Sequence, residues 1–234
     1  MKKTNIYFWL FFLSPAIGYL VLQSVVMRIA WNYIPYNENF DSLSLGLCIL
    51  LPIVAGGYYL AERGKRRKKE VEVRKNGEMI LLVLMSGIGL SLMTGFFFNK
   101  NAVWEIMPAF AIFVSVIVVP INEEIIYRGM VLRRAEEGFG RLTAVIVSGV
   151  VFGVAHAGTG RMLMAVFAGF LFGLVAERFG TIWASIPLHM LVNVAVLWDR
   201  LYELPIFIYV AGFIVALIPA VIMSSELRQN CNRQ

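Results

Sequence analysis

The stretch Val119-Pro120-Ile121-Asn122-Glu123-Glu124-Ile125-Ile126-Tyr127-Arg128 brings two adjacent carboxylates and an arginine into an apolar run. This run begins near Ile106 and is long enough to cross a membrane. A charged side chain at the centre of a bilayer costs about 3 kcal/mol on insertion scales, so such groups need a partner or a function. The alternative is that the stretch ends a helix at the membrane surface, where water solvates all three charged groups.

Helical geometry separates the two carboxylates. Successive residues on a helix point about 100° apart. Glu124 and Arg128 are four residues apart on one face, in the favourable order for an ion pair. We therefore expect Arg128 to hold Glu124 ionised as an internal pair. Glu123 faces elsewhere and has no local partner, and a desolvated carboxylate of this kind is suited to act as a general base.

The composition of the whole chain indicates an integral membrane protein. Of its 234 residues, 59% are hydrophobic and 15% are charged, and the mean hydropathy is +0.73. Soluble domains carry about 25% charged residues. We predict an all-α fold, a polytopic bundle of about eight transmembrane helices that forms one domain over residues 1–234. The two cysteines, Cys48 and Cys231, form no CxxC motif, which excludes a structural zinc finger.

Basic residues flank the apolar segments on alternate sides, and the positive-inside rule then places both termini in the cytoplasm. The basic stretch 63–75 is predicted to be a cytoplasmic loop that contacts anionic lipid. A nucleic-acid patch is the minor alternative, and we expect no nucleic-acid partner. The first segment is too long for a signal-peptide core and is expected to remain as a span. The predicted spans are residues 6–27, 43–60, 79–98, 106–134, 142–157, 162–176, 182–198 and 204–224.

The fifth to seventh spans are short for lipid-exposed helices, which need about 20 residues. They are also the spans that combine glycines with polar residues, so we expect them in the interior of the bundle. Ala165, Gly169 and Gly173 repeat at intervals of four residues. Such ladders of small residues let two helices approach closely, and we expect this span to pack tightly against a neighbour.

Three polar pairs with four-residue spacing stand out on separate spans. They are Glu124 with Arg128, Phe152 with His156, and His189 with Asn193. At ~1.5 Å per residue from the predicted span ends, Glu123, both histidines and Asn193 fall in one layer of the bilayer. Taken singly, each histidine is more often a hydrogen-bonded core residue, Asn193 an interhelical contact and Phe152 a packing residue. Two histidines and a carboxylate at one depth instead favour a functional site.

The ordered set of motifs Glu123-Glu124-x-x-x-Arg128, Phe152-x-x-x-His156 and His189-x-x-x-Asn193 resembles the signature of a known family. This is the CPBP family of intramembrane endopeptidases (CAAX protease and bacteriocin-processing, also called ABI). It includes the type II CAAX prenyl endopeptidases and bacterial proteins linked to bacteriocin or peptide processing and to self-immunity. The resemblance covers residues 106–198, which would form the catalytic core.

The resemblance implies an intramembrane protease that hydrolyses a peptide bond of a membrane-associated substrate. A peptide precursor, a bacteriocin or pheromone leader, or a CAAX-type protein would fit, and we expect a bacterial cell membrane as the location. Donors such as an amide and an imidazole N–H stabilise an oxyanion well in a dry pocket. The implied roles are Glu123 with His156 for water activation, His189 with Asn193 for the oxyanion, Glu124 with Arg128 as a structural pair, and Phe152 for shaping the pocket around His156.

Other interpretations remain open on the sequence. Glu123, His156 and His189 could instead bind zinc, with Glu124 as base, because two histidines and a carboxylate suit a catalytic zinc site. No HExxH motif is present and Glu124 is expected to pair with Arg128, so we favour a mechanism without a cofactor. A non-catalytic immunity or regulatory partner protein is the alternative function. A transporter that uses Glu123 as a proton relay is a third hypothesis.

Overall fold

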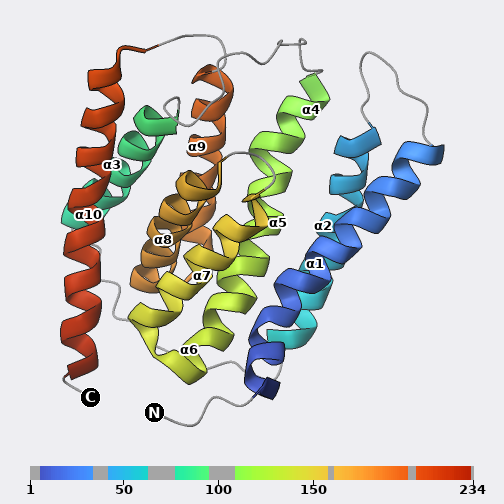
Figure 1. Ribbon diagram of the computed structural model, residues 1–234, viewed down its shortest axis with the longest axis horizontal. Coiled ribbons are helices and arrows are strands. Elements are labelled where there is room, and N and C mark those ends of the chain that lie inside the picture. The colour runs from blue at the N-terminus through green and yellow to red at the C-terminus, as the bar shows by residue number, and fades with distance from the viewer. Residues whose placement is uncertain are drawn as a thin grey trace.

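A computed structural model describes residues 6–33, 42–62, 77–94, 109–157, 161–199 and 204–232. Within these ranges the chain is helical and contains no strand, which confirms the all-α prediction. Most of the helices run from top to bottom of the view in Figure 1, across the longest axis of the molecule, which is horizontal there. The elements are α1 (Ile6–Tyr33), α2 (Ser42–Glu62), α3 (Gly77–Met93), α4 (Ala109–Phe113), the π-helix η2 (Val114–Val118), α5 (Val119–Glu124), the π-helix η3 (Ile125–Leu132), α6 (Arg133–Phe139), α7 (Arg141–Ala155), α8 (Met162–Phe179), the 3₁₀ turn η5 (Ile182–Ala184), α9 (Ser185–Asp199) and α10 (Ile206–Asn232).

Each predicted span coincides with a helical segment, but the segments differ in length. Four are long and apolar enough to cross a membrane, namely Ile6–Tyr33, Ala109–Phe139, Met162–Phe179 and Ile206–Arg228. The other apolar helices have 10–17 residues in the part of the chain that the structure describes. The length and apolar composition of these four helices indicate an integral membrane protein. The count of eight spans stays a prediction. The basic stretch 63–75 lies outside the described residues.

Several helix ends differ from the predicted ones. The first helix continues to Tyr33 instead of ending at Met27, and the last continues to Asn232 instead of ending at Ser224. Hydropathy detects the apolar part of a helix, whereas hydrogen bonding continues into its polar ends. His156 is the C-cap of α7 and lies at its end, whereas the sequence placed it inside the span.

The segment Ala109–Phe139 is interrupted twice by π-helical turns, η2 just before Pro120 and η3 just after Glu124. A π turn inside an α-helix is rare and is found mostly at functional sites. The carboxylates thus lie on a short α-helical piece between two turns of altered register. At Pro120 the structure shows a change of hydrogen-bond register from π to α.

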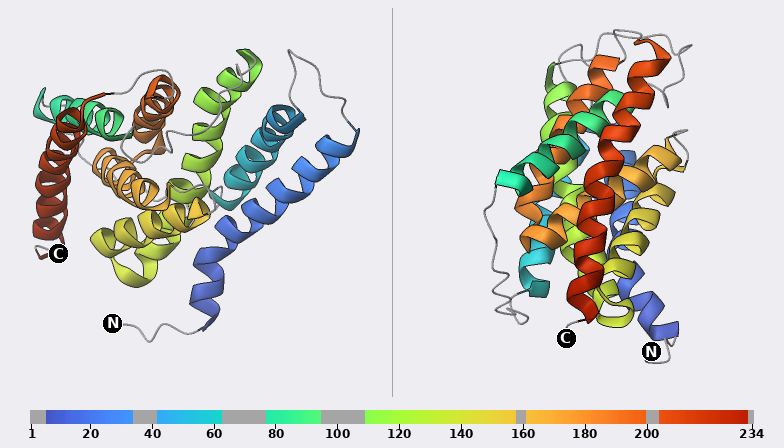
Figure 2. Two further views of the ribbon diagram at one scale, coloured as in Figure 1. Left: turned by 45° about the horizontal axis from the view of Figure 1, so that its top comes forward. Right: turned by 90° about the vertical axis from the view of Figure 1, so that its left-hand side faces the viewer.

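Glycines let α7 and α8 approach closely. A Cβ on Gly149 would lie 2.9 Å from the backbone nitrogen of Phe170, and a Cβ on Gly153 would lie 2.9 Å from the carbonyl oxygen of Met162. A Cβ on Gly169 would lie 3.1 Å from the Cα of Gly149. The predicted close packing of the small-residue ladder is therefore confirmed, and the two helices run side by side (Figure 2).

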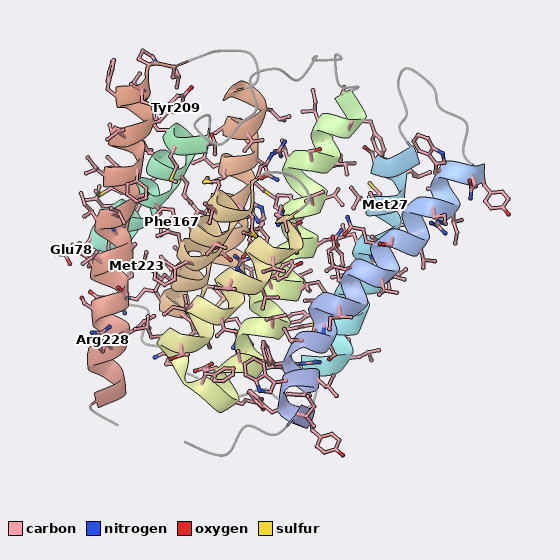
Figure 3. The ribbon with its side chains drawn as sticks, viewed as in Figure 1. Met27, Glu78, Phe167, Tyr209, Met223 and Arg228 are labelled. Atoms are coloured by element: carbon pink, nitrogen blue, oxygen red, sulfur yellow. The ribbon has the colours of Figure 1, made fainter. Side chains whose placement is uncertain are left out.

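Helices α3 and α10 form a second close pair at the opposite side of the bundle from α1 and α2 (Figures 1 and 2). A Cβ on Gly89 would lie 2.5 Å from the backbone nitrogen of Ala216, so only glycine fits there. Met223 of α10 is fully buried, and Phe167 of α8 contacts Phe213 of α10 at 5.6 Å between ring centroids. Figure 3 shows Phe167 and Met223 in this region.

Helix α1 is joined to α6 through a carbonyl that a proline exposes. Pro15 lies inside α1 and has no N–H to donate to the carbonyl of Phe11, four residues earlier. Arg134 Nη1 donates to that carbonyl at 2.7 Å and to Ser14 Oγ at 2.9 Å. The arginine thus compensates the helix for the hydrogen bond that Pro15 removes.

Candidate functional site

A pocket of about 240 Å³ lies between η2, α5, α7, α8 and α9. Most of its wall is apolar, and its polar groups come from η2, α5 and α9 and from the ends of α7 and α8. These are properties of a small-molecule or peptide site more than of a packing defect. The lining residues are Ser115, Val119, Glu123, Phe152, His156, Arg161, Met164, Ala165, Ala168, Phe172, His189, Val192, Asn193, Val196 and Leu197.

Glu123 lies between the two histidines of the chain. His156 Nε2 is 3.8 Å from Glu123 Oε1, and His189 Nε2 is 3.6 Å from Glu123 Oε2. The side chain of Glu123 is 13% exposed, so it is largely withdrawn from solvent but reaches the pocket. The sequence placed these groups only in one layer; the structure brings them together from α5, α7 and α9.

The hydrogen bond at the other ring nitrogen sets the tautomer of His156. His156 Nδ1 lies 2.8 Å from the carbonyl oxygen of Phe152, one turn earlier in α7. A carbonyl only accepts, so Nδ1 carries the proton and donates it. In the neutral ring, Nε2 then presents a lone pair toward Glu123. The C-cap position at the end of α7 permits this bond back to the Phe152 carbonyl.

His189 is held by the second carboxylate of the motif. His189 Nδ1 lies 3.0 Å from Glu124 Oε1, and Arg128 Nη1 lies 3.0 Å from the same oxygen. The side chains of Glu124 and Arg128 are both fully buried. The predicted Glu124–Arg128 pair is present, and it extends to a third residue. Sequence reasoning missed the contact of Glu124 with His189, because it joins residues 65 positions apart.

Arg128 is enclosed on several sides. Its Nη2 donates to the carbonyl oxygen of Gly169 at 3.0 Å. Its Cζ lies 4.5 Å from the ring centroid of Phe152 and 5.3 Å from that of Phe172, within the range of cation–π attraction. A Cβ on Gly169 would lie 3.1 Å from Arg128 Nη2, so glycine at this position leaves room for the guanidinium.

Two phenylalanine rings complete the walls around the histidines. The Phe152 ring lies 4.6 Å from that of His156 and 5.7 Å from that of His189, as centroid distances. Phe172 stacks on His189 at 4.6 Å. Phe152 was expected to shape the pocket around His156, and it lies against that ring. Phe172 was not singled out from the sequence, since a phenylalanine in a buried helix carries no distinguishing signal.

Asn193 lines the pocket, and its amide is engaged by the backbone. Asn193 Nδ2 donates to the carbonyl oxygen of Ser115 in η2 at 2.8 Å. Ser115 was not predicted as part of the site. Its contribution is a backbone oxygen, which no side-chain motif reveals.

The candidate metal ligands Glu123, His156 and His189 face one another in the pocket. In the part of the chain that the structure describes, no group of three or more His, Cys, Asp or Glu side chains has the arrangement of a metal site. The zinc alternative, with Glu123, His156 and His189 as ligands, stays a prediction. Its test is the effect of a chelator on activity.

The comparison with protein families gives one match. Residues 105–195 match the family described as "Type II CAAX prenyl endopeptidase Rce1-like". This stretch contains all three motifs that carry the resemblance, which is thereby confirmed. No curated protein and no solved structure matches the chain. The family supports a membrane protease in general and leaves the substrate, the roles of the individual residues and the metal dependence to experiment.

Proposed function

We propose that this relative of the type II CAAX prenyl endopeptidases hydrolyses a peptide bond of a membrane-associated peptide or protein, with Glu123 as its general base. The observation that carries the proposal is the position of Glu123, which faces Nε2 of both histidines in one pocket. A pure scaffold has no need of a carboxylate and two imidazoles converging in a largely apolar cavity.

Water activation follows from the Glu123–His156 geometry. Their 3.8 Å separation is too long for a direct hydrogen bond but suits a water molecule that bridges the two groups. Such a water would donate one hydrogen to Glu123 and the other to His156 Nε2. Its lone pair would then attack the scissile carbonyl carbon. Glu123 accepts the proton as the C–O bond forms, and it passes the proton to the amine nitrogen as the C–N bond breaks.

Oxyanion stabilisation sets a condition on His189. Because Nδ1 already donates to Glu124, His189 donates from Nε2 only when both ring nitrogens carry protons. The cationic ring gives a balanced site, with two negative charges on Glu123 and Glu124 and two positive charges on Arg128 and His189. Asn193 would supply the second donor to the oxyanion.

Glu124 and Arg128 act as positioning residues in this proposal. They do not reach the reacting atoms; they hold the His189 ring at the angle that points Nε2 toward the pocket. Removing either residue should lower activity by letting the His189 ring move, because small misplacements of a catalytic group slow a reaction strongly.

Comparative peptidomics of two matched strains tests the proposal and identifies the substrate. One strain carries the wild-type chain and the other Glu123→Gln, at equal abundance in the membrane. We expect a peptide or a trimmed protein terminus that is present only with the wild type. If Glu123→Gln produces the same peptides and retains the wild-type phenotype, the carboxylate is not catalytic, and a non-catalytic partner protein becomes the better explanation.

The same cleavage, once found, distinguishes the two mechanisms. A chelator should leave the rate unchanged if Glu123 activates water without a metal. Loss of cleavage with a chelator, restored by added zinc, would establish the zinc mechanism instead.

A further inference from the structure

The hydrogen bond between Asn193 and Ser115 depends on a backbone register that only the structure reveals. In η2 the N–H of Val119 donates to the carbonyl of Val114, five residues earlier. The next bond in this π register would run from residue 120 to the carbonyl of Ser115. Residue 120 is proline, which has no N–H. The Ser115 carbonyl is therefore left without its backbone donor.

Asn193 supplies the missing donor from another helix. Its Nδ2 lies 2.8 Å from the Ser115 oxygen, and both residues line the pocket. A side-chain amide carries two N–H groups on one planar nitrogen. When one of them is fixed on a carbonyl, the direction of the other is fixed as well. The proline thus determines how the second N–H of Asn193 is oriented.

A related arrangement occurs at the second π turn. Ser148 Oγ, from α7, donates to the carbonyl of Tyr127 in η3 at 2.9 Å, and both groups are buried. Side chains of neighbouring helices thus bond backbone carbonyls in both π segments. At η3 the donor is a hydroxyl outside the pocket lining, whereas at η2 it is the amide assigned to the oxyanion.

We propose that Pro120 is a positioning residue, which frees the Ser115 carbonyl to anchor the Asn193 amide so that its second N–H faces the substrate carbonyl. The inference rests on the proposed function for the role of that second N–H. The anchoring itself is independent of any activity. It predicts that Pro120 affects turnover only through Asn193.

A double-mutant cycle on cleavage kinetics tests this coupling. Pro120→Ala returns an N–H that competes for the Ser115 oxygen, and we expect kcat to fall about tenfold with KM unchanged. In an Asn193→Ala background, the same change should have no further effect on kcat. The matched control is Pro219→Ala, which restores an N–H inside α10 and should leave kcat unchanged. Equal losses from Pro120→Ala in both backgrounds would overturn the proposal and indicate a general structural role.

A spectroscopic measurement answers the question without any substrate. In protein labelled with ¹⁵N-asparagine, the side-chain amide signals of Asn193 are those missing from Asn193→Ala. One of its two protons should resonate downfield, as expected for a hydrogen bond to a carbonyl, and should move upfield in Pro120→Ala. An unchanged spectrum in Pro120→Ala would overturn the anchoring. If the wild type cleaves nothing while the spectrum responds as expected, the proposed function fails and the anchoring stands.

Discussion

Two clusters of charged side chains have the same contact distances but opposite surroundings. In the buried cluster of Glu124, Arg128 and His189, two contacts of 3.0 Å converge on one carboxylate oxygen. In the rim pair, Arg178 and Glu226 also lie 3.0 Å apart, but their side chains are 22% and 38% exposed. Burial, and not distance, separates a pair that fixes geometry from one that is partly solvated.

The difference follows from what each partner loses when the other is removed. Water replaces a missing partner at the rim at little cost. Inside the bundle nothing replaces it, and an uncompensated charge remains. Glu124 and Arg128 therefore act as one unit with His189, and the pocket residues depend on them. The comparison predicts a graded series of effects, which the following substitutions test.

The largest effect is expected from Glu124→Gln, which leaves Arg128 buried without a counter-charge. Breaking a buried pair in this way costs about 3–5 kcal/mol. We expect a strongly lowered midpoint of thermal unfolding in detergent and reduced abundance in the membrane. The double variant Glu124→Gln/Arg128→Met removes both charges and should recover part of the stability without restoring cleavage. A double variant no more stable than Glu124→Gln would contradict this view of the cluster.

The sequence predicted the local part of this cluster and not the part that crosses between helices. The Glu124–Arg128 pair could be predicted because both residues lie on one helix, where the geometry is fixed by spacing. The approach of His189 to Glu124 depends on how α9 packs against α5, and depth along a helix does not determine its rotation. The histidines were expected in the same layer as Glu123, while their distances to it required the fold.

The contribution of the backbone to the site was the hardest part to predict from the sequence. Hydropathy and spacing treat residues 106–134 as one α-helix, so they give no sign that η2 and η3 shift the register. The carbonyl that Pro120 leaves to Asn193 belongs to Ser115, five residues earlier, and this pairing arises only in the π register. The small-residue ladder, by contrast, predicted the close packing of α8, because small side chains leave room for a neighbouring helix to approach.

Gly169→Ala should have the next largest effect, because the added methyl group crowds the buried cluster without changing any charge. The added Cβ would lie 3.0 Å from Phe152 Cδ1 and 3.1 Å from Arg128 Nη2. Crowding of this kind costs about 1–3 kcal/mol. We expect a lower unfolding midpoint and slower cleavage. The matched control is Gly18→Ala in α1, where the Cβ meets nothing within 4 Å and stability should not fall. Equal effects of the two substitutions would contradict the prediction.

Arg134→Met should have a smaller effect, since it removes a half-exposed contact at the α6 end of the bundle. The Phe11 carbonyl, exposed by Pro15, would lose its donor from Arg134 and keep the Ser14 Oγ donor at 3.0 Å. Arg134 makes two such hydrogen bonds, to the Phe11 carbonyl and to Ser14 Oγ, and each contributes about 1 kcal/mol. The variant Pro15→Ala restores the backbone N–H and should make the Arg134→Met change smaller, as thermal unfolding of the four proteins would show. Identical losses with and without Pro15 would mean that the arginine stabilises the interface through other contacts.

The smallest effect is expected for Arg178→Ala, which removes the partly exposed partner of Glu226 at the end of α8. Exposed ion pairs contribute about 0–1 kcal/mol, and salt screens them. The unfolding midpoint should fall slightly at low salt, and the difference from wild type should vanish at high salt. Cleavage should be unaffected, because neither Arg178 nor Glu226 lines the pocket. A loss of stability comparable to that of Glu124→Gln, or one independent of salt, would contradict the comparison. It would show that exposure does not separate the two clusters and that the rim pair stabilises the fold.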